Sequence, residues 1–177
     1  MPVKVNGEDT YRAESFLNIY GSREGLYGLG QQQAGVWNHR GNTVELAHDN
    51  SSIAVPLMVS SNGYGLFWNN ASRSRFNNRF ANYLYISSEV ADAIDYYFIY
   101  GPELDRVVAG YRELTGDAPL FGKWAYGFWQ CKNRYKTQAE ILGVAKKYRE
   151  LKIPVDNIVQ DWFWWNRKGE HVFNTNF

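Results

Sequence analysis

Short apolar runs separated by turn-forming residues occupy the first two thirds of the chain and predict antiparallel strands. Residues 53–61 and 64–68 have strand length and are joined by Asn62-Gly63. Asn-Gly between two such runs predicts a tight β-hairpin in which both central residues have positive φ. Residues 83–86 and 93–100 are expected to form two further strands. This pattern is typical of part of a β-sandwich.

The pattern changes near Asp117-Ala118-Pro119. Before this point, apolar side chains at helical spacing and a glycine at the cap position predict a short helix. These residues are Leu104, Val107, Val108, Tyr111 and Leu114, followed by Gly116. A helix followed by glycine and proline predicts a domain boundary, with a partial sandwich domain over residues 1–118 and a second domain over 119–177.

The second region reads as strand, helix and strand. Residues 124–130 and 155–162 are apolar runs of strand length, and Thr137-Gln138-Ala139-Glu140 is a capping box that opens a helix. The helix is expected to end before Ile153-Pro154, because proline disfavours a helical residue before it. Such a βαβ unit has parallel strands joined by a right-handed crossover.

One βαβ unit buries too little apolar area to be stable alone, and both edges of its sheet are open. We therefore expect the chain to be a piece of a larger protein, cut at both ends. The first six residues lack the apolar stretch of a secretory signal, but in a piece of a protein this carries no information about a leader.

Composition narrows the classes of function. Nineteen basic against eighteen acidic residues argue against a protein held to nucleic acid by a basic face, and the apolar runs are too short to cross a membrane. One cysteine and three scattered histidines predict neither a disulfide nor a metal site. Aromatic residues make up 17% of the chain. They indicate either a large β-rich core or a surface that stacks on sugar rings.

Candidate chemistry lies where the two predicted parallel strands end, because ligands bind at the carboxyl ends of such strands. Asp161 directly follows the second strand and is followed by Trp162, Phe163, Trp164 and Trp165. A carboxylate that accepts hydrogen bonds from vicinal hydroxyls, beside an indole that covers a pyranose ring, suits a sugar. The alternative is that Asp161 caps a loop and the tryptophans fill the end of a barrel.

Other motifs favour structural interpretations. Gly28-Leu29-Gly30 lacks the spacing of a dinucleotide-binding loop and predicts a tight β-turn. Cys131 is expected to be a buried cysteine at a strand end rather than an activated thiol. His48-Asp49 resembles part of a catalytic triad, but the chain has no matching serine motif. The cluster from Arg73 to Phe80 is interpreted as a solvated loop rather than a nucleic-acid stripe.

Several motifs, in the same order, resemble glycoside hydrolase family 31 over about residues 20–177. In the first region they are Tyr27-Gly28-Leu29-Gly30-Gln31, the hairpin of residues 56–68, and residues 95–98 with Gly101-Pro102. In the second region they are residues 123–131 (KWAYGFWQC), Arg134-Tyr135, Thr137-Gln138 and residues 153–162 (IPVDNIVQDW).

The resemblance implies an N-terminal β-sandwich followed by a (β/α)8 barrel, of which this chain holds the first βαβ unit. It implies a retaining α-glycosidase that acts on oligosaccharides without a cofactor, by a nucleophile and an acid/base about 5 Å apart. Both catalytic carboxylates are expected beyond Phe177. The residues of these motifs most resemble those of the α-xylosidases of the family, with the α-glucosidases as the alternative.

Four residues are expected to bind substrate. By the resemblance, Asp161 hydrogen-bonds the sugar, Asp49 lies on a sandwich loop over the barrel mouth, and Trp162 and Trp165 form walls of the pocket. A non-catalytic carbohydrate-binding module is the alternative from another class. It agrees with the aromatic richness, but such a module should complete its own fold.

Overall fold

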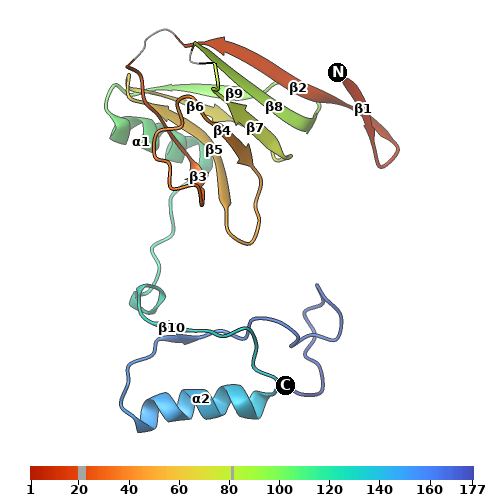
Figure 1. The fold of residues 1–177 in the computed structure, drawn as a ribbon, viewed down its shortest axis with the longest axis vertical. Helices are drawn as coiled ribbons and strands as arrows, with labels where there is room; N and C mark the ends of the chain where they lie inside the picture. Colours follow the sequence, from red (N-terminus) through yellow and green to blue (C-terminus); the bar gives the residue numbers. More distant parts are fainter. Residues whose placement is uncertain (20–22, 81) are drawn as a thin grey trace. The chain divides into compact units, whose positions relative to one another are not determined.

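A computed structural model describes residues 1–19, 23–80 and 82–177 of the chain, which divides into two compact units (Figure 1). The first unit is Met1–Ala118 and the second is Pro119–Phe177. The first is built from antiparallel strands and one α-helix, and the second from one α-helix and two short parallel strands. The expected fold class, an antiparallel sandwich region followed by the start of a barrel, is confirmed.

In the first unit the strands form two antiparallel sheets. Among the described residues, one sheet has the order β1-β2-β8-β7-β4 and the other β3-β5-β6-β9. The strands are β1 (Pro2–Val5), β2 (Glu8–Asn18), β3 (Leu26–Gln31), β4 (Thr43–Leu46), β5 (Ile53–Ser60), β6 (Tyr64–Trp68), β7 (Ser74–Asn77), β8 (Tyr83–Ala91) and β9 (Tyr96–Tyr100). The sequence pattern predicted only β5, β6, β8 and β9, and it began β9 three residues too early.

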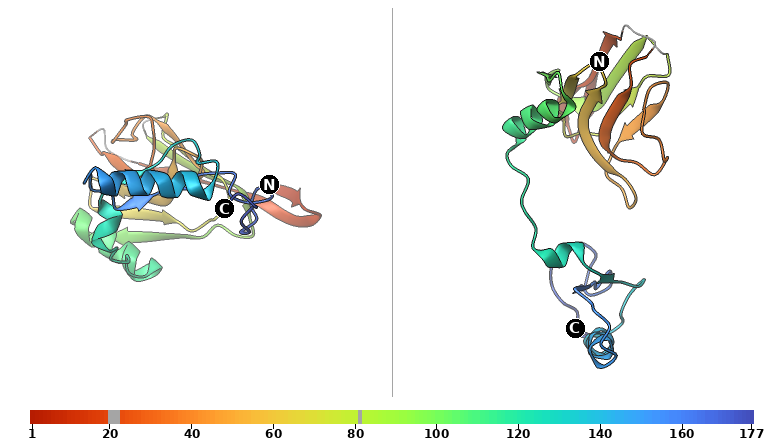
Figure 2. Two further views of the ribbon diagram at one scale, coloured as in Figure 1. Left: turned by 90° about the horizontal axis from the view of Figure 1, so that it is seen from below. Right: turned by 90° about the vertical axis from the view of Figure 1, so that its left-hand side faces the viewer.

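The core of the first unit lies between the two sheets. Its buried side chains come from both: Phe76 and Ile86 from one sheet, Met58 and Leu66 from the other. On the opposite face of β5, β6 and β9, α1 (Leu104–Thr115) buries Val107 completely (Figure 2). The predicted helix is thus confirmed, and Gly116 follows it with φ 86°. Its ψ of 171° is not the left-handed helical value expected for the cap.

The β5–β6 hairpin is confirmed, but its turn differs from the prediction. Ser60 pairs with Tyr64, so the loop has three residues rather than two. Gly63 has φ 79° and its amide donates to the Ser60 carbonyl, whereas Asn62 has negative φ. A three-residue loop needs only one left-handed residue, which glycine supplies here.

The segment Gly28-Leu29-Gly30 is not the predicted tight turn. It lies inside β3, which pairs with β5 from Leu26↔Ser60 to Gln31↔Ile53 and shifts its register between Gly28 and Gly30. All three residues have positive φ. The irregularity is therefore a bulge that bends an ordered strand.

Gly30→Ala is expected to destabilise the first unit strongly. A Cβ at this position would lie 2.0 Å from the Ile53 carbonyl oxygen, and the residue has φ 89°. The backbone conformation alone costs about 1–2 kcal/mol for alanine, and the clash adds about 1–3 kcal/mol. Urea-induced unfolding measures the loss. Gly35→Ala is the matched control, since Gly35 also has positive φ but open space around it; an equal loss in both variants would contradict the clash.

The basic and aromatic cluster from Arg73 to Phe80 contains the strand β7 in its middle, whereas Arg73, Arg79 and Phe80 lie outside the strand, so the predicted loop is only partly correct. In β7, Phe76 is buried, while Arg75 pairs with Glu45 on the neighbouring strand β4. Arg73 lies near the carboxylates of Glu45 and Glu89, at 3.7 and 3.9 Å. Arg73 and Arg75 are thus paired with carboxylates on the sheet surface.

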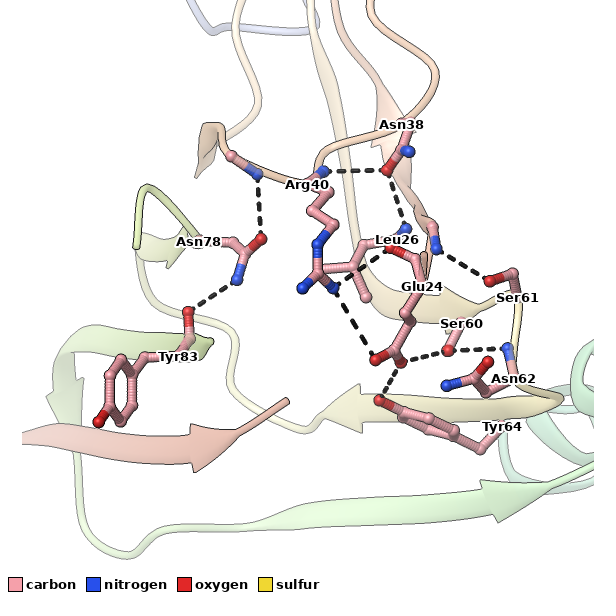
Figure 3. Close-up of polar contacts among 12 residues, drawn as sticks. Glu24, Leu26, Asn38, Arg40, Ser60, Ser61, Asn62, Tyr64, Asn78 and Tyr83 are labelled. Atoms are coloured by element: carbon pink, nitrogen blue, oxygen red, sulfur yellow. Dashed lines mark hydrogen bonds and ion pairs between the residues drawn. The ribbon is translucent and has the colours of Figure 1, made fainter. Parts of the chain in front are cut away.

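A buried polar cluster joins the β3 region to the β5–β6 hairpin (Figure 3). The buried Glu24 carboxylate accepts hydrogen bonds from the Ser60 hydroxyl at 2.5 Å and the Tyr64 hydroxyl at 2.6 Å. The Arg40 guanidinium lies 4.0 Å from this carboxylate and also donates to the Glu24 carbonyl. Burial and the Glu24 carboxylate raise the pKa of Tyr64 to about 12. This cluster had no signature in the sequence.

In the second unit, β10 (Trp129–Gln130) and β11 (Asn157–Ile158) are parallel neighbours, and α2 (Gln138–Glu150) lies beside them (Figures 1 and 2). The expected order of strand, helix and parallel strand is confirmed. Both strands are shorter than predicted, and residues 123–126 form a 3₁₀ turn, η1 (Lys123–Tyr126), instead of the start of a strand. Within the described ranges, no helix has the length and apolar character required to cross a membrane.

Helix α2 begins as the capping box predicts, with one difference. The Thr137 side chain accepts from the Glu140 amide at 3.1 Å. The Glu140 carboxylate accepts a hydrogen bond from the Lys136 amide at 2.6 Å rather than from the Thr137 amide. The helix ends at Glu150, ahead of Ile153-Pro154 as expected.

Candidate functional site

The candidate site lies where β10 and β11 end. The strands pair in parallel through Trp129↔Asn157 and Gln130↔Ile158, and the Val159 amide then donates to the Gln130 carbonyl at 2.9 Å. The segments that follow the two strands therefore leave the same edge of the sheet. These segments are residues 131–136 and 159–165.

Asp161, the predicted sugar-binding carboxylate, is exposed at this edge. Within the described ranges, no side chain or amide of the chain pairs with its carboxylate. Two other carboxylates of the second unit are instead used by the fold: Asp156 accepts from the Phe128 amide before β11, and Glu140 accepts from the Lys136 amide at the start of α2. Asp161 is thus an ionisable group available to a ligand, and it does not cap a loop.

The aromatic residues after Asp161 divide into two groups. The rings of Trp162 and Phe163 lie 4.2 Å apart and are 39% and 47% exposed. Trp164 and Trp165 are half-buried, and their rings meet edge to face with centroids 5.2 Å apart. The backbone of Trp165 also forms an isolated antiparallel β-bridge with Phe173. Apolar faces of Trp162 and Phe163 are therefore available for a sugar ring.

A cavity of about 480 Å³ opens beside these rings. Trp165 and Phe163 line it, whereas Asp161 and Trp162 lie outside the lining. Its other lining residues are Arg134, Tyr135, Lys136, Asn166, Asn174, Thr175 and Asn176. A space of this size, with amide and aromatic side chains, can hold a saccharide.

The Glu140 carboxylate holds both ends of the segment 132–136, which follows β10. The Lys132 ammonium lies 2.5 Å from one carboxylate oxygen of Glu140, and the Lys136 amide donates to the other. These hydrogen bonds from Lys132 and Lys136 lower the pKa of Glu140 below its usual value. Residues 132–136 therefore form a closed loop in front of α2, which the sequence did not reveal.

Asp49 lies in the first unit, on the loop between β4 and β5. Its carboxylate Oδ1 accepts from the Ser51 amide at 2.7 Å and from the Ser51 hydroxyl at 3.1 Å. These bonds lower the pKa of Asp49, so the exposed carboxylate is ionised near neutral pH. The neighbouring His48 is used locally, with Nδ1 facing the Ala54 amide at 3.4 Å.

Cys131 differs from the expectation of a buried strand-end residue. It is exposed, because β10 ends at Gln130 and the chain turns away there. In the part of the chain that the structure describes, no group of His, Cys, Asp and Glu side chains is arranged to hold a metal ion.

Two family models match the chain in the order of its units. The "Glycosyl hydrolase 31 N-terminal galactose mutarotase-like domain" matches residues 7–77. The "Glycosyl hydrolases family 31 TIM-barrel domain" matches residues 118–177. The class defined by fold and site is a barrel protein preceded by a β-sandwich domain.

Full-length relatives agree with these matches. An α-xylosidase from Saccharolobus solfataricus is 45% identical over 95% of this chain and 23% of its own length. A family 31 glucosidase from Pseudescherichia vulneris, described as uncharacterised, is 38% identical over 85% of this chain and 28% of its own. The chain belongs to glycoside hydrolase family 31 and spans about a quarter of the length of these relatives.

Solved structures show the same likeness. A family 31 α-xylosidase from a soil metagenome, complexed with xylose, has a TM-score of 0.84 and 34% identity over 99% of this chain and 25% of its own. A family 31 dextranase from Flavobacterium johnsoniae, complexed with glucose, has a TM-score of 0.75 and 27% identity over 93% of this chain and 21% of its own.

Proposed function

We propose that this chain is a segment of a retaining α-glycosidase that removes terminal α-linked xylose or glucose from oligosaccharides. Residues 1–118 supply part of its N-terminal sandwich, and residues 119–177 supply the start of its catalytic barrel. The observation that carries the proposal is Asp161, an exposed carboxylate without a partner among the described residues. It follows β11 at its carboxyl end and precedes two aromatic residues whose rings are in contact.

The chemistry of this edge supports a sugar ligand. The Asp161 carboxylate can accept hydrogen bonds from two vicinal hydroxyls, and the rings beside it offer apolar faces to a pyranose. The related α-xylosidase and dextranase structures are complexed with xylose and glucose. We assign Asp161 to the sugar hydroxyls, Trp165 to a wall of the cavity, Trp162 to an exposed ring face beside Asp161, and Asp49 to substrate binding from a loop of the sandwich domain.

The catalytic carboxylates are proposed to lie outside these 177 residues. A retaining glycosidase needs two carboxyl groups about 5 Å apart, one as nucleophile and one as acid/base. Among the described residues of the second unit, Asp161 is the one carboxylate that follows a strand and has no hydrogen-bond or ion-pair partner. One such group can bind a hydroxyl but cannot both attack the anomeric carbon and protonate the leaving oxygen.

The exposed apolar side chains of the second unit favour an enzyme segment over a self-contained carbohydrate-binding module. Leu142 on α2 is 50% exposed, Leu151 directly after this helix is 56% exposed, and Trp129 of β10 is half exposed. A module that completes its own fold would bury such side chains, since each contributes about 1.5–3 kcal/mol on burial.

The full-length protein is expected to hydrolyse an aryl α-xyloside or α-glucoside, whereas the 177-residue chain alone should give no turnover. Proton NMR of the first sugar released should show the α-anomer, because retention passes through two displacements. The ratio of kcat/KM for the two substrates decides between xylose, which lacks the exocyclic hydroxymethyl group, and glucose.

Each part of the proposal has its own contradicting result. An initial β-anomer would exclude retention. Turnover by the purified 177-residue chain would place the catalytic pair within it. A full-length protein without glycosidase activity, yet with sugar affinity, would favour the binding module instead.

A further inference from the structure

Both chain neighbours of Asp161 are held by the segment that follows β10. The side-chain amide nitrogen of Gln160, Nε2, donates to the Tyr135 carbonyl at 3.0 Å and to the Trp162 carbonyl at 3.2 Å. The Trp162 indole N–H donates to Asn133 Oδ1 at 3.0 Å. The side chains on either side of Asp161 are thus anchored to residues that precede Asp161 by 26 positions or more.

Arg134 completes this anchor. Its guanidinium carbon lies 4.5 Å from the centre of the Phe163 ring and 5.5 Å from that of Trp162. A planar guanidinium can stack on aromatic rings and so fix their orientation. The compact ammonium group of a lysine is attracted to the rings but does not align them in this way. Arg134 therefore orders both rings beside Asp161 at once.

The backbone at Phe163 indicates that the anchor works against local strain. Phe163 has φ 61°, in the left-handed region that bulky side chains avoid. Its carbonyl accepts from the Asn174 side-chain amide at 2.6 Å. Such a conformation persists only where surrounding contacts determine it, and strained residues of this kind gather at functional sites.

The supporting segment is itself fixed, because Glu140 holds Lys132 on one side of Arg134 and the Lys136 amide on the other. A chain of contacts therefore runs from the start of α2, through Asn133 and Arg134, to the residues that flank Asp161.

We propose that Arg134, assisted by Asn133, is a positioning residue that aims the Asp161 carboxylate at the sugar. This inference rests on the proposed function, since it gives Arg134 a role only through Asp161. Arg134 lines the cavity beside these rings, but its effect on turnover should pass through Asp161 and should vanish when Asp161 is absent.

A double-mutant cycle in the full-length enzyme tests this role, with kcat and KM measured on the preferred aryl α-glycoside. Arg134→Ala should lower kcat/KM about 10- to 100-fold, because a misplaced contact group costs about this much. Arg134→Lys should restore part of the loss, since lysine keeps the charge without the planar fork. The double variant Arg134→Ala/Asp161→Ala should match Asp161→Ala within about two-fold, whereas independent residues would multiply.

Arg106→Ala on α1 is the matched control, since this exposed arginine belongs to the first unit; its kcat/KM should equal that of the wild type. If Arg134→Ala does not fold, Asn133→Ala tests the same cycle by removing only the acceptor of the Trp162 indole. Unchanged kcat/KM in Arg134→Ala, or multiplied losses in the double variant, would overturn the inference. An inactive wild-type enzyme would overturn the proposed function itself, whereas an Asp161→Ala variant without effect would remove Asp161, and with it the role of Arg134, from the sugar site of an enzyme that is still a glycosidase.

Discussion

Asp161→Ala in the full-length enzyme is expected to lower kcat/KM about 100- to 1,000-fold. A carboxylate that accepts two sugar hydroxyls makes charge-assisted hydrogen bonds, each of about 1.5–3 kcal/mol. Asp161 is exposed, so each bond should lie near the lower end of this range. Losing both then costs about 3–4 kcal/mol, which corresponds to this change in rate. Steady-state kinetics on the preferred aryl α-glycoside measures it, together with the thermal unfolding temperature.

Two variants separate binding from general destabilisation. Asp161→Asn keeps the shape of the side chain but not its charge, so its kcat/KM should fall between wild type and alanine. Asp117→Ala removes an exposed carboxylate at the junction of the two units and should leave kcat/KM unchanged. A wild-type kcat/KM in Asp161→Ala would remove this residue from the sugar site.

Two of the strands that the sequence pattern did not predict, β2 and β3, have identifiable irregularities. In β2, the register shifts between Tyr11 and Ala13, which breaks the two-residue alternation of apolar positions. In β3, three successive residues with positive φ resemble a turn in sequence, although the strand pairs along β5 on both sides of the bulge. The alternation of apolar and polar residues predicts regular strands only. The irregular strands β2 and β3 are instead defined by their pairing with β8 and β5.

The second unit shows the opposite error, because the predicted strands are longer than the observed ones. Residues 124–130 and 155–162 are apolar enough for strands, but pairing is limited to two residues in each. Before the pairs, the Phe128 carbonyl accepts from the amides of both Asp156 and Asn157 at 3.1 Å, so the regular ladder begins only after them. Apolar composition predicts burial, whereas strand length depends on an available partner.

The candidate site was predictable only in part. Asp161 and its aromatic neighbours could be found because a strand predicts where its own end lies. The roles of Arg134 and Glu140 could not, since they depend on two loops meeting in space. The aromatic richness also needed the structure: Trp68, Phe76 and Tyr135 are buried, whereas Trp37, Tyr100 and Tyr126 are highly exposed. A large core therefore accounts for only some of these rings.

Glu24→Ala is expected to lower the free energy of unfolding of the first unit by about 3–5 kcal/mol, the range found when one partner of a buried ion pair is removed. The variant loses the acceptor of the Ser60 and Tyr64 hydroxyls and the carboxylate that faces the Arg40 guanidinium (Figure 3). Ser60 is completely buried, so water cannot easily replace the lost bond. Urea-induced unfolding of the 177-residue chain measures the change.

Three further variants decide whether the loss belongs to the cluster. Glu24→Gln retains one acceptor oxygen and should cost less than alanine, because the buried charge is lost but not the whole polar contact. Tyr64→Phe should cost about 1–2 kcal/mol, the value of one hydrogen bond to a charged group. Glu8→Ala, at an exposed position in β2, should stay within about 0.5 kcal/mol of wild type. The Glu24 cluster stabilises the fold as argued only if alanine at Glu24 is far more destabilising than alanine at Glu8, because both variants remove one carboxylate and differ in what that carboxylate contacts.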